Sequence, residues 1–226
     1  MYPDGFSVAG WLRASVVARI AALFHGLLEA RGTMTWLAIV TATGLVLSHG
    51  SERLNTALLL SSSTNLHNLR KDPLTVLTTS AFFVDSFPDY LEFAVICLCL
   101  VAPLENAIGF WRWLIGLVAG HVGATLIIAI ALSVSVLSTA ERPGRVVDVG
   151  VSYGLASLVA VFVYLLHGWQ RLALAILIVA IIIPPVLTSG QFSDWGHLVA
   201  CGLGLAIGPY LVRRATPLSS QYASQC

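Results

Sequence analysis

The chain consists of long apolar stretches separated by short polar breaks, and this pattern restricts the fold more than any other feature of the sequence. Hydrophobic residues make up 57% of the 226 residues and charged residues only 10%. Soluble domains carry about 25% charged residues, so lipid is expected to cover much of this molecule. Backbone groups inside hydrocarbon must find partners within their own segment, so the apolar stretches are predicted to be helices.

Six of these stretches are predicted to cross the membrane, at about 34–49, 89–106, 110–138, 149–167, 171–188 and 195–212. Residues 50–88 are predicted to form a long loop, polar in its first half, whose second half dips into the membrane interface. We therefore predict an all-α membrane protein with a six-helix domain at 33–215 and a short polar tail at 216–226.

The N-terminal segment, residues 1–32, is predicted to lie on the membrane surface. Between residues 8 and 31, apolar side chains recur at helical spacing on one face: Leu12, Val16, Ile20, Leu23 and Leu27. Such an amphipathic helix binds at the interface, with its arginines near the lipid headgroups. No cleavable signal peptide is recognised, so the chain is expected to start near Met1.

The charge distribution predicts the orientation and excludes some partners. An even number of spans puts both termini on one side, which then holds seven Arg and Lys residues against five on the other. By the positive-inside rule, we expect a multi-pass protein of the cell membrane with cytoplasmic termini. The net charge of +1 argues against a nucleic-acid partner, and the cysteines lack the spacing of a zinc site. We expect no metal and no cofactor.

Two polar residues at membrane depth are candidates for catalysis. Ser152 lies about one turn inside the fourth predicted span, and His197 lies at the start of the sixth. Both spans are expected to begin on the outer face, so the two side chains can share one depth. A serine hydroxyl becomes a nucleophile when a neutral imidazole accepts its proton. The alternative is that Ser152 bonds a carbonyl of its own helix and His197 is interfacial.

Small residues accompany both candidates. Gly150 and Gly154 bracket Ser152, while Gly204 and Gly208 form a G-x-x-x-G pair after His197. Small residues let two helix backbones approach closely in lipid. We therefore predict that Gly154, Gly204 and Gly208 pack the fourth span against the sixth.

Other ionisable residues have structural explanations that compete with functional ones. Glu92 lies one turn inside the second span, so it needs a partner or water. His121 is expected to be packed and hydrogen-bonded, and Asp194 to favour the start of its helix. Glu105 and Arg112 flank a short turn and are expected to form an ion pair.

The serine at a glycine-framed helix start and the histidine two spans later resemble the rhomboid family. The similarity runs from about Leu74 to Gly208, and Gly150-Val151-Ser152 matches the first three positions of the family's G-x-S-G motif. Leu104-Glu105 resembles the glutamate at the inner end of the second span. The resemblance implies a six-helix rhomboid-like bundle, with Ser152 as nucleophile and His197 as general base. It also implies cleavage of transmembrane substrates without a metal.

The chain departs from the family pattern around the oxyanion. Tyr153 occupies the fourth position of G-x-S-G. An ungapped alignment through Leu104-Glu105 puts Asp89 and Phe93 at the positions of the family's His-x-x-x-Asn pair. The backbone N–H of Ser152 remains available to an oxyanion. The candidates for oxyanion or supporting groups are Gly150, Tyr153, Asp89 and Glu92.

Three functions are consistent with the sequence. The first is an intramembrane serine endopeptidase, and the second a catalytically inactive rhomboid-like protein that binds transmembrane helices. The third is a small transporter that uses Glu92, Asp89 and His121 as an ion path. The expected partners are a transmembrane-helix substrate or client protein and the lipid bilayer.

Overall fold

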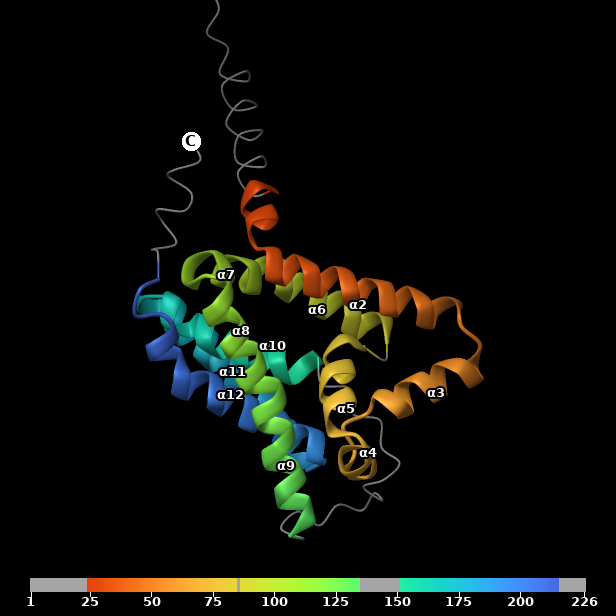
Figure 1. Ribbon diagram of the computed structural model, residues 1–226. Helices are drawn as coiled ribbons and strands as arrows, with labels where there is room; N and C mark the ends of the chain where they lie inside the picture. Colours follow the sequence, from red (N-terminus) through yellow and green to blue (C-terminus); the bar gives the residue numbers. More distant parts are fainter. Residues whose placement is uncertain (1–23, 85, 135–150, 216–226) are drawn as a thin grey trace, which may run out of the picture.

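The computed structural model describes residues 24–84, 86–134 and 151–215, and the regular elements within these ranges are all helical (Figure 1). Residues 24–29 are helical, in agreement with the end of the predicted surface helix. The rest of that helix and the tail at 216–226 lie outside the described residues.

The elements, in chain order, are α2 (Arg31–His49), α3 (Glu52–Ser62), α4 (Leu66–Lys71), α5 (Pro73–Thr79), η1 (Ser80–Phe82), α6 (Phe87–Ile96), η2 (Cys97–Val101), α7 (Ala102–Ile108), α8 (Phe110–Val118), η3 (Ala119–Gly123), α9 (Ala124–Ser133), α10 (Val151–Phe162), η4 (Val163–Leu165), α11 (Gly168–Thr188) and α12 (Phe192–Leu211). The elements η2 and η3 are π-helical turns that join α6 to α7 and α8 to α9 without a break. Each stretch predicted to span the membrane therefore contains helix.

Within the described ranges, three continuous helices are long and apolar enough to cross a membrane: Phe87–Ile108, Phe110–Ser133 and Gly168–Thr188. The helices α2, α10 and α12 occupy the other three predicted spans. The count of six spans and the domain limits 33 and 215 stay predictions. Between the first two long helices, the chain turns at Gly109. The backbone φ of this residue is +83°, a value that residues with a Cβ rarely adopt.

The segment 50–88, predicted as one long loop, instead contains the three helices α3, α4 and α5. Their starts are capped by Ser51, Asn65 and Asp72, whose side chains accept hydrogen bonds from backbone N–H groups in the first turn. Such caps satisfy donors that a helix start leaves free. Pro73 at the first position of α5 favours the helix further. Short polar helices of this kind lack the long apolar period on which the sequence prediction relied.

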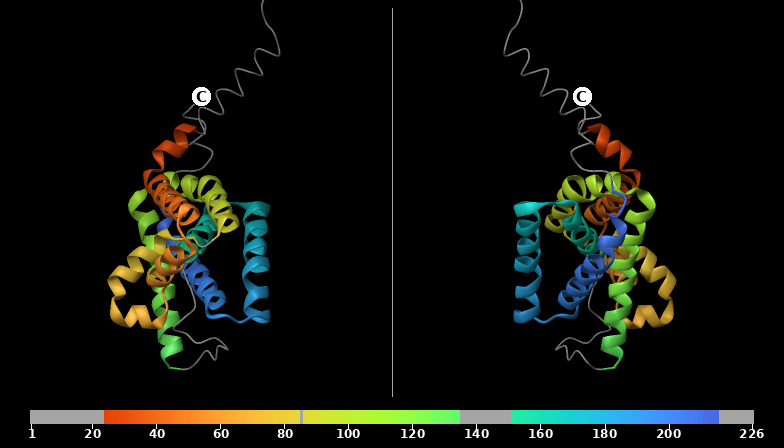
Figure 2. Two further views of the ribbon diagram at one scale, coloured as in Figure 1. Left: turned by 90° about the vertical axis from the view of Figure 1, so that its right-hand side faces the viewer. Right: turned by 90° about the vertical axis from the view of Figure 1, so that its left-hand side faces the viewer.

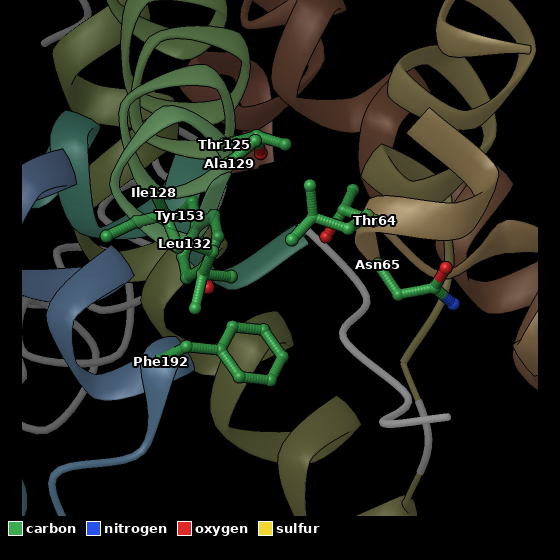
Figure 3. A pocket seen from close by; sticks show the side chains of 9 residues that line it. Thr64, Asn65, Thr125, Ile128, Ala129, Leu132, Tyr153 and Phe192 are labelled. Carbon is green, nitrogen blue, oxygen red and sulfur yellow. The ribbon is translucent and has the colours of Figure 1, made fainter. Parts of the chain in front are cut away.

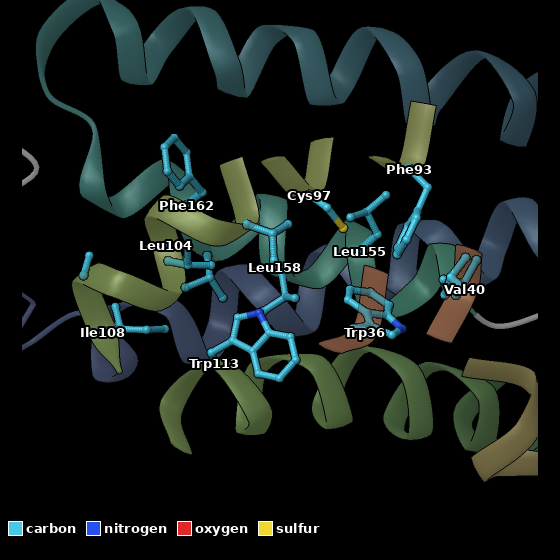
Figure 4. Packing of buried hydrophobic residues seen from close by; sticks show 14 of the residues in the cluster. Trp36, Val40, Phe93, Cys97, Leu104, Ile108, Trp113, Leu155, Leu158 and Phe162 are labelled. Carbon is cyan, nitrogen blue, oxygen red and sulfur yellow. The ribbon is translucent and has the colours of Figure 1, made fainter. Parts of the chain in front are cut away.

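Aromatic side chains join α2 to the interior of the bundle. The Trp36 ring meets Phe93 of α6 edge to face, with centroids 4.9 Å apart, and lies 6.2 Å from the Trp113 ring of α8. Figure 4 shows these rings with Leu155 and Leu158 of α10 in the same cluster. The core thus lies where α2, α6, α8 and α10 converge.

The central helix α10 is buried along most of its length and packs closely against α12. A stripe of small residues on α12, Gly196, Ala200, Gly204 and Gly208, is buried at this contact. A Cβ added to Gly204 would lie 2.3 Å from the Ser157 carbonyl oxygen. This approach brings the helices that carry Ser152 and His197 together.

Glu105 is hydrogen-bonded to the start of α2 and does not pair with Arg112. The predicted ion pair between Glu105 and Arg112 is therefore wrong. The buried carboxylate accepts hydrogen bonds from the backbone N–H groups of Gly32 (2.8 Å) and Thr33 (2.6 Å), and from the Thr33 hydroxyl (2.7 Å). A carboxylate at a helix N-terminus satisfies free donors and complements the helix dipole. Charge-assisted bonds of this kind are stronger than the exposed pair that the sequence suggested.

The helix α11 stands apart from the rest of the bundle (Figure 2). It runs between η4 and α12, and none of its residues, all of which the structure describes, is buried. Its apolar side chains therefore face lipid or the space between α11 and the bundle.

Candidate functional site

The candidate site is an open cavity of about 320 Å³ lined by residues of α6, α10, α11 and α12. Its lining residues are Glu92, Ile96, Ser152, Leu155, Ala156, Val159, Ile178, Ile181, Ile182, Pro185, Asp194, His197 and Cys201. Most of the wall is apolar, with a few polar groups from three different helices. This composition is typical of a binding pocket for a largely apolar ligand.

Ser152 and His197, the two predicted catalytic residues, line this one cavity. Ser152 lies in the first turn of α10, and His197 lies in the second turn of α12. Both side chains are half-buried. Gly150, the predicted neighbour of Ser152, lies outside the described residues.

Tyr153, at the position where the rhomboid motif has glycine, packs against His197. The two rings meet edge to face, with centroids 5.0 Å apart and an angle of 81° between their planes. The Tyr153 ring fills the space beside Gly196, where an added Cβ would lie 2.3 Å from the phenol oxygen. A buried ring in this position restricts the orientations available to the imidazole. The glycine directly before His197 was the sequence signal for this contact, which the sequence analysis missed.

The other side of Tyr153 faces a small cavity between the loop before α4 and the helices α9 and α12 (Figure 3). Thr64 and Asn65 lie across this cavity from Tyr153, and Phe192 closes one end. Tyr153 therefore links the polar segment at 62–65, which is buried, to the wall of the candidate site.

Asp194 completes the first turn of α12 at the cavity wall. Its Oδ2 accepts hydrogen bonds from the Ser189 hydroxyl (2.5 Å) and from the Gln191 backbone N–H (3.0 Å), as part of a capping box. The prediction that Asp194 favours the start of its helix is confirmed. Its carboxylate is thereby engaged within the protein.

Glu92 also lines the cavity, whereas Asp89 and Phe93 do not. The Asp89 carboxylate accepts a hydrogen bond from Ser86 at the exposed start of α6. Phe93 is buried against Trp36 on the opposite side of α6. The π-helical turn Cys97–Val101 lies between Glu105 and these positions, and such a turn adds a residue to the helical path. Glu92, one position before Phe93, is the residue of this part of α6 that lines the cavity.

His121 lies elsewhere in the bundle, in the π-helical turn η3. It is buried, and its Nε2 lies 2.7 Å from the Leu77 carbonyl oxygen and 3.3 Å from the Ser80 hydroxyl. These bonds fix α5 and η1 to the bundle and confirm the prediction of a packed, hydrogen-bonded histidine. The three residues suggested for an ion path thus have separate surroundings: Glu92 in the cavity, Asp89 at the start of α6, and His121 under α5.

The contribution of α11 to the site could not be read from the sequence. Ile178, Ile181, Ile182 and Pro185 form one wall, yet they belong to a uniformly apolar stretch in which no position is distinguished. Cys201, one turn after His197, also lines the cavity. It was interpreted from the sequence only as a small packed residue.

A family model described as rhomboid-like protein matches residues 26–217, which is most of the chain. The chain belongs to the rhomboid-like protein family. No curated protein and no solved structure matched the sequence. Together with the apolar helices, membership of this family identifies the rhomboid-like chain as an integral membrane protein.

Proposed function

We propose that this rhomboid-like protein is an intramembrane serine endopeptidase, in which Ser152 is the nucleophile and His197 the general base. The observation that carries this proposal is the common cavity: a hydroxyl and an imidazole from two closely packed helices line one apolar space. Nucleophile and base on neighbouring rigid elements are what acyl transfer requires.

In this mechanism, the Ser152 Oγ attacks the carbonyl carbon of a peptide bond while His197 accepts the hydroxyl proton. The tetrahedral intermediate collapses to an ester on Ser152, and His197 gives the proton to the leaving amine. Water then hydrolyses the ester with His197 again acting as base. The Ser152 backbone N–H, in the first described turn of α10, is the donor that would bind the oxyanion.

The position of α11 supports a membrane-helix substrate. Because α11 has no buried residue and forms one wall of the cavity, a second apolar helix can reach the cavity from the lipid beside it. The Tyr153 ring keeps the imidazole in one orientation as the substrate enters. We further propose that the protein lies in the cell membrane with both termini cytoplasmic, which reporter fusions to the two termini would test.

The test of the proposed function is labelling with a fluorophosphonate, which reacts with activated serines. The purified wild-type protein is expected to be labelled, and Ser152→Ala to lose the label because the nucleophile is removed. His197→Ala is expected to slow labelling by a factor on the order of 10⁶, because loss of the general base costs about as much as loss of the nucleophile. Ser133→Ala, which changes an exposed serine at the end of α9, serves as the matched control. Equal labelling of wild type and Ser152→Ala, or no labelling of either, would contradict the proposal.

A second candidate, a catalytically inactive protein that binds transmembrane helices, is favoured by one observation. The described lining of the cavity contains no amide, Lys or Arg side chain that would donate to an oxyanion. Loss of such a donor costs a factor on the order of 10²–10³ in rate. Under this alternative, a transmembrane peptide binds wild type and Ser152→Ala equally, and neither protein cleaves it or takes the fluorophosphonate label.

A further inference from the structure

Glu92 is an exposed carboxylate near the start of a helix that is long and apolar enough to span a membrane, and no described residue pairs with it. It lies in the second turn of α6, in the continuous apolar helix Phe87–Ile108. In the part of the chain that the structure describes, no hydrogen bond or ion pair joins Glu92 to another residue. Acidic side chains at such positions are rare, because transfer of an uncompensated charge out of water is costly.

The surroundings of Glu92 do not supply the missing partner. The described cavity wall carries no Lys or Arg, and the α11 residues across from α6 are isoleucines and a proline. The other acidic group, Asp194, is already held by Ser189 and the Gln191 N–H. Among the described residues, the Glu92 carboxylate therefore lines the cavity without a basic side chain beside it, and a basic group on a bound substrate can reach it.

We propose that Glu92 is a specificity-determining residue that selects transmembrane substrates with a Lys or Arg beside the segment that enters the cavity. This inference rests on the proposed function and identifies its substrate class. The long stems of Lys and Arg pack along apolar surface while the charged end reaches a polar group. The apolar wall of α11 suits such a stem, and the Glu92 carboxylate suits its charged end.

The experiment measures binding in the Ser152→Ala background, so that catalysis is not required. The full-length protein is reconstituted in neutral phosphatidylcholine vesicles, which offer no anionic lipid to compete. The probes are three single-span Leu/Ala peptides, identical except for Lys, Gln or Glu at one juxtamembrane position, and binding is followed by energy transfer. A charge-assisted contact is expected to make the Lys peptide bind about tenfold more tightly than the Gln peptide.

Three further variants sharpen the test. Glu92→Gln is expected to reduce the ratio of the two dissociation constants to about one, and Glu92→Lys to make the Glu peptide the preferred ligand. Glu52→Gln, which changes an exposed glutamate on α3 away from the cavity, is the matched control and keeps the wild-type ratio. Equal binding of the Lys and Gln peptides to the protein with Glu92 intact would overturn the inference. So would a ratio that Glu92→Gln leaves unchanged.

Cleavage of the same peptides by the protein with Ser152 intact separates this inference from the proposed function. A Lys preference in binding without cleavage would support Glu92 as a selector and contradict the protease. Cleavage without any preference would support the protease and overturn the role of Glu92. Equal loss of cleavage for the Lys and Gln peptides in Glu92→Gln would also overturn it, because the residue would then act on the reaction.

Discussion

The contact between α10 and α12 can be tested by adding one methyl group at Gly204. An ideal Cβ at this position lies 2.3 Å from the Ser157 carbonyl oxygen and 2.9 Å from the Ala160 Cβ. Ordinary contacts are about 3.5 Å, so Gly204→Ala forces the two backbones about 1 Å apart. Overpacking of this kind costs about 1–3 kcal/mol, which exceeds the gain of about 0.5–1 kcal/mol from replacing a helical glycine by alanine. We expect a net loss of about 1–2 kcal/mol in the free energy of unfolding.

The assay is unfolding by dodecyl sulfate in mixed micelles, followed by circular dichroism. Gly202→Ala provides the matched control, because it makes the same substitution on the same helix where an added Cβ meets nothing within 4 Å. That variant is expected to be neutral or slightly stabilising. If Ser152 and His197 act together, Gly204→Ala also lowers cleavage by a factor of about 100, since a shift near 1 Å misplaces the pair. Identical unfolding midpoints for Gly204→Ala and Gly202→Ala would refute the packing argument.

Three further predictions concern residues outside this contact. Glu105→Ala leaves buried N–H donors at the start of α2 without an acceptor, so the free energy of unfolding in the same assay is expected to fall by about 3 kcal/mol. Tyr153→Ala removes the ring beside His197 and is expected to cost about 3–5 kcal/mol and to lower kcat for peptide cleavage more than it changes KM. Hydrogen bonds from the side chain and backbone of Thr75 hold the pKa of Asp72 below its usual 3.8. Its contribution to stability is therefore present above that value and is lost as the pH falls through the lowered pKa, so amide protection factors in α5 should fall in acid, but not in Asp72→Asn.

The sequence was sufficient to predict the long apolar helices and the family, because both depend on long-range regularities, but not the short helices α3, α4 and α5. Apolar stretches in lipid must be helical, and a serine and a histidine in small-residue surroundings are recognisable without coordinates. The structure also brings Ser152 and His197 to one cavity, as their matched depth suggested.

The details that depend on local backbone geometry could not be predicted. The π-helical turn at Cys97–Val101 changes which residues of α6 face the cavity, and no residue type marks such a turn in the sequence. Similarly, the sequence suggested only the nearby Arg112 as a partner of Glu105, and the fold shows that the distant start of α2 is adjacent instead. Proximity along the chain favoured the wrong partner.

The absence of buried residues in α11, every one of which the structure describes, has a consequence for how this helix can vary. On the face of α11 that points away from the cavity, no packing contact selects the side chains. The bilayer there requires an apolar side chain but hardly distinguishes one apolar side chain from another. The outward face of α11 should therefore tolerate wholesale replacement by other aliphatic residues of similar length. The length of the apolar surface of α11 can therefore change to match a thicker or thinner bilayer without a change in the interior of the protein.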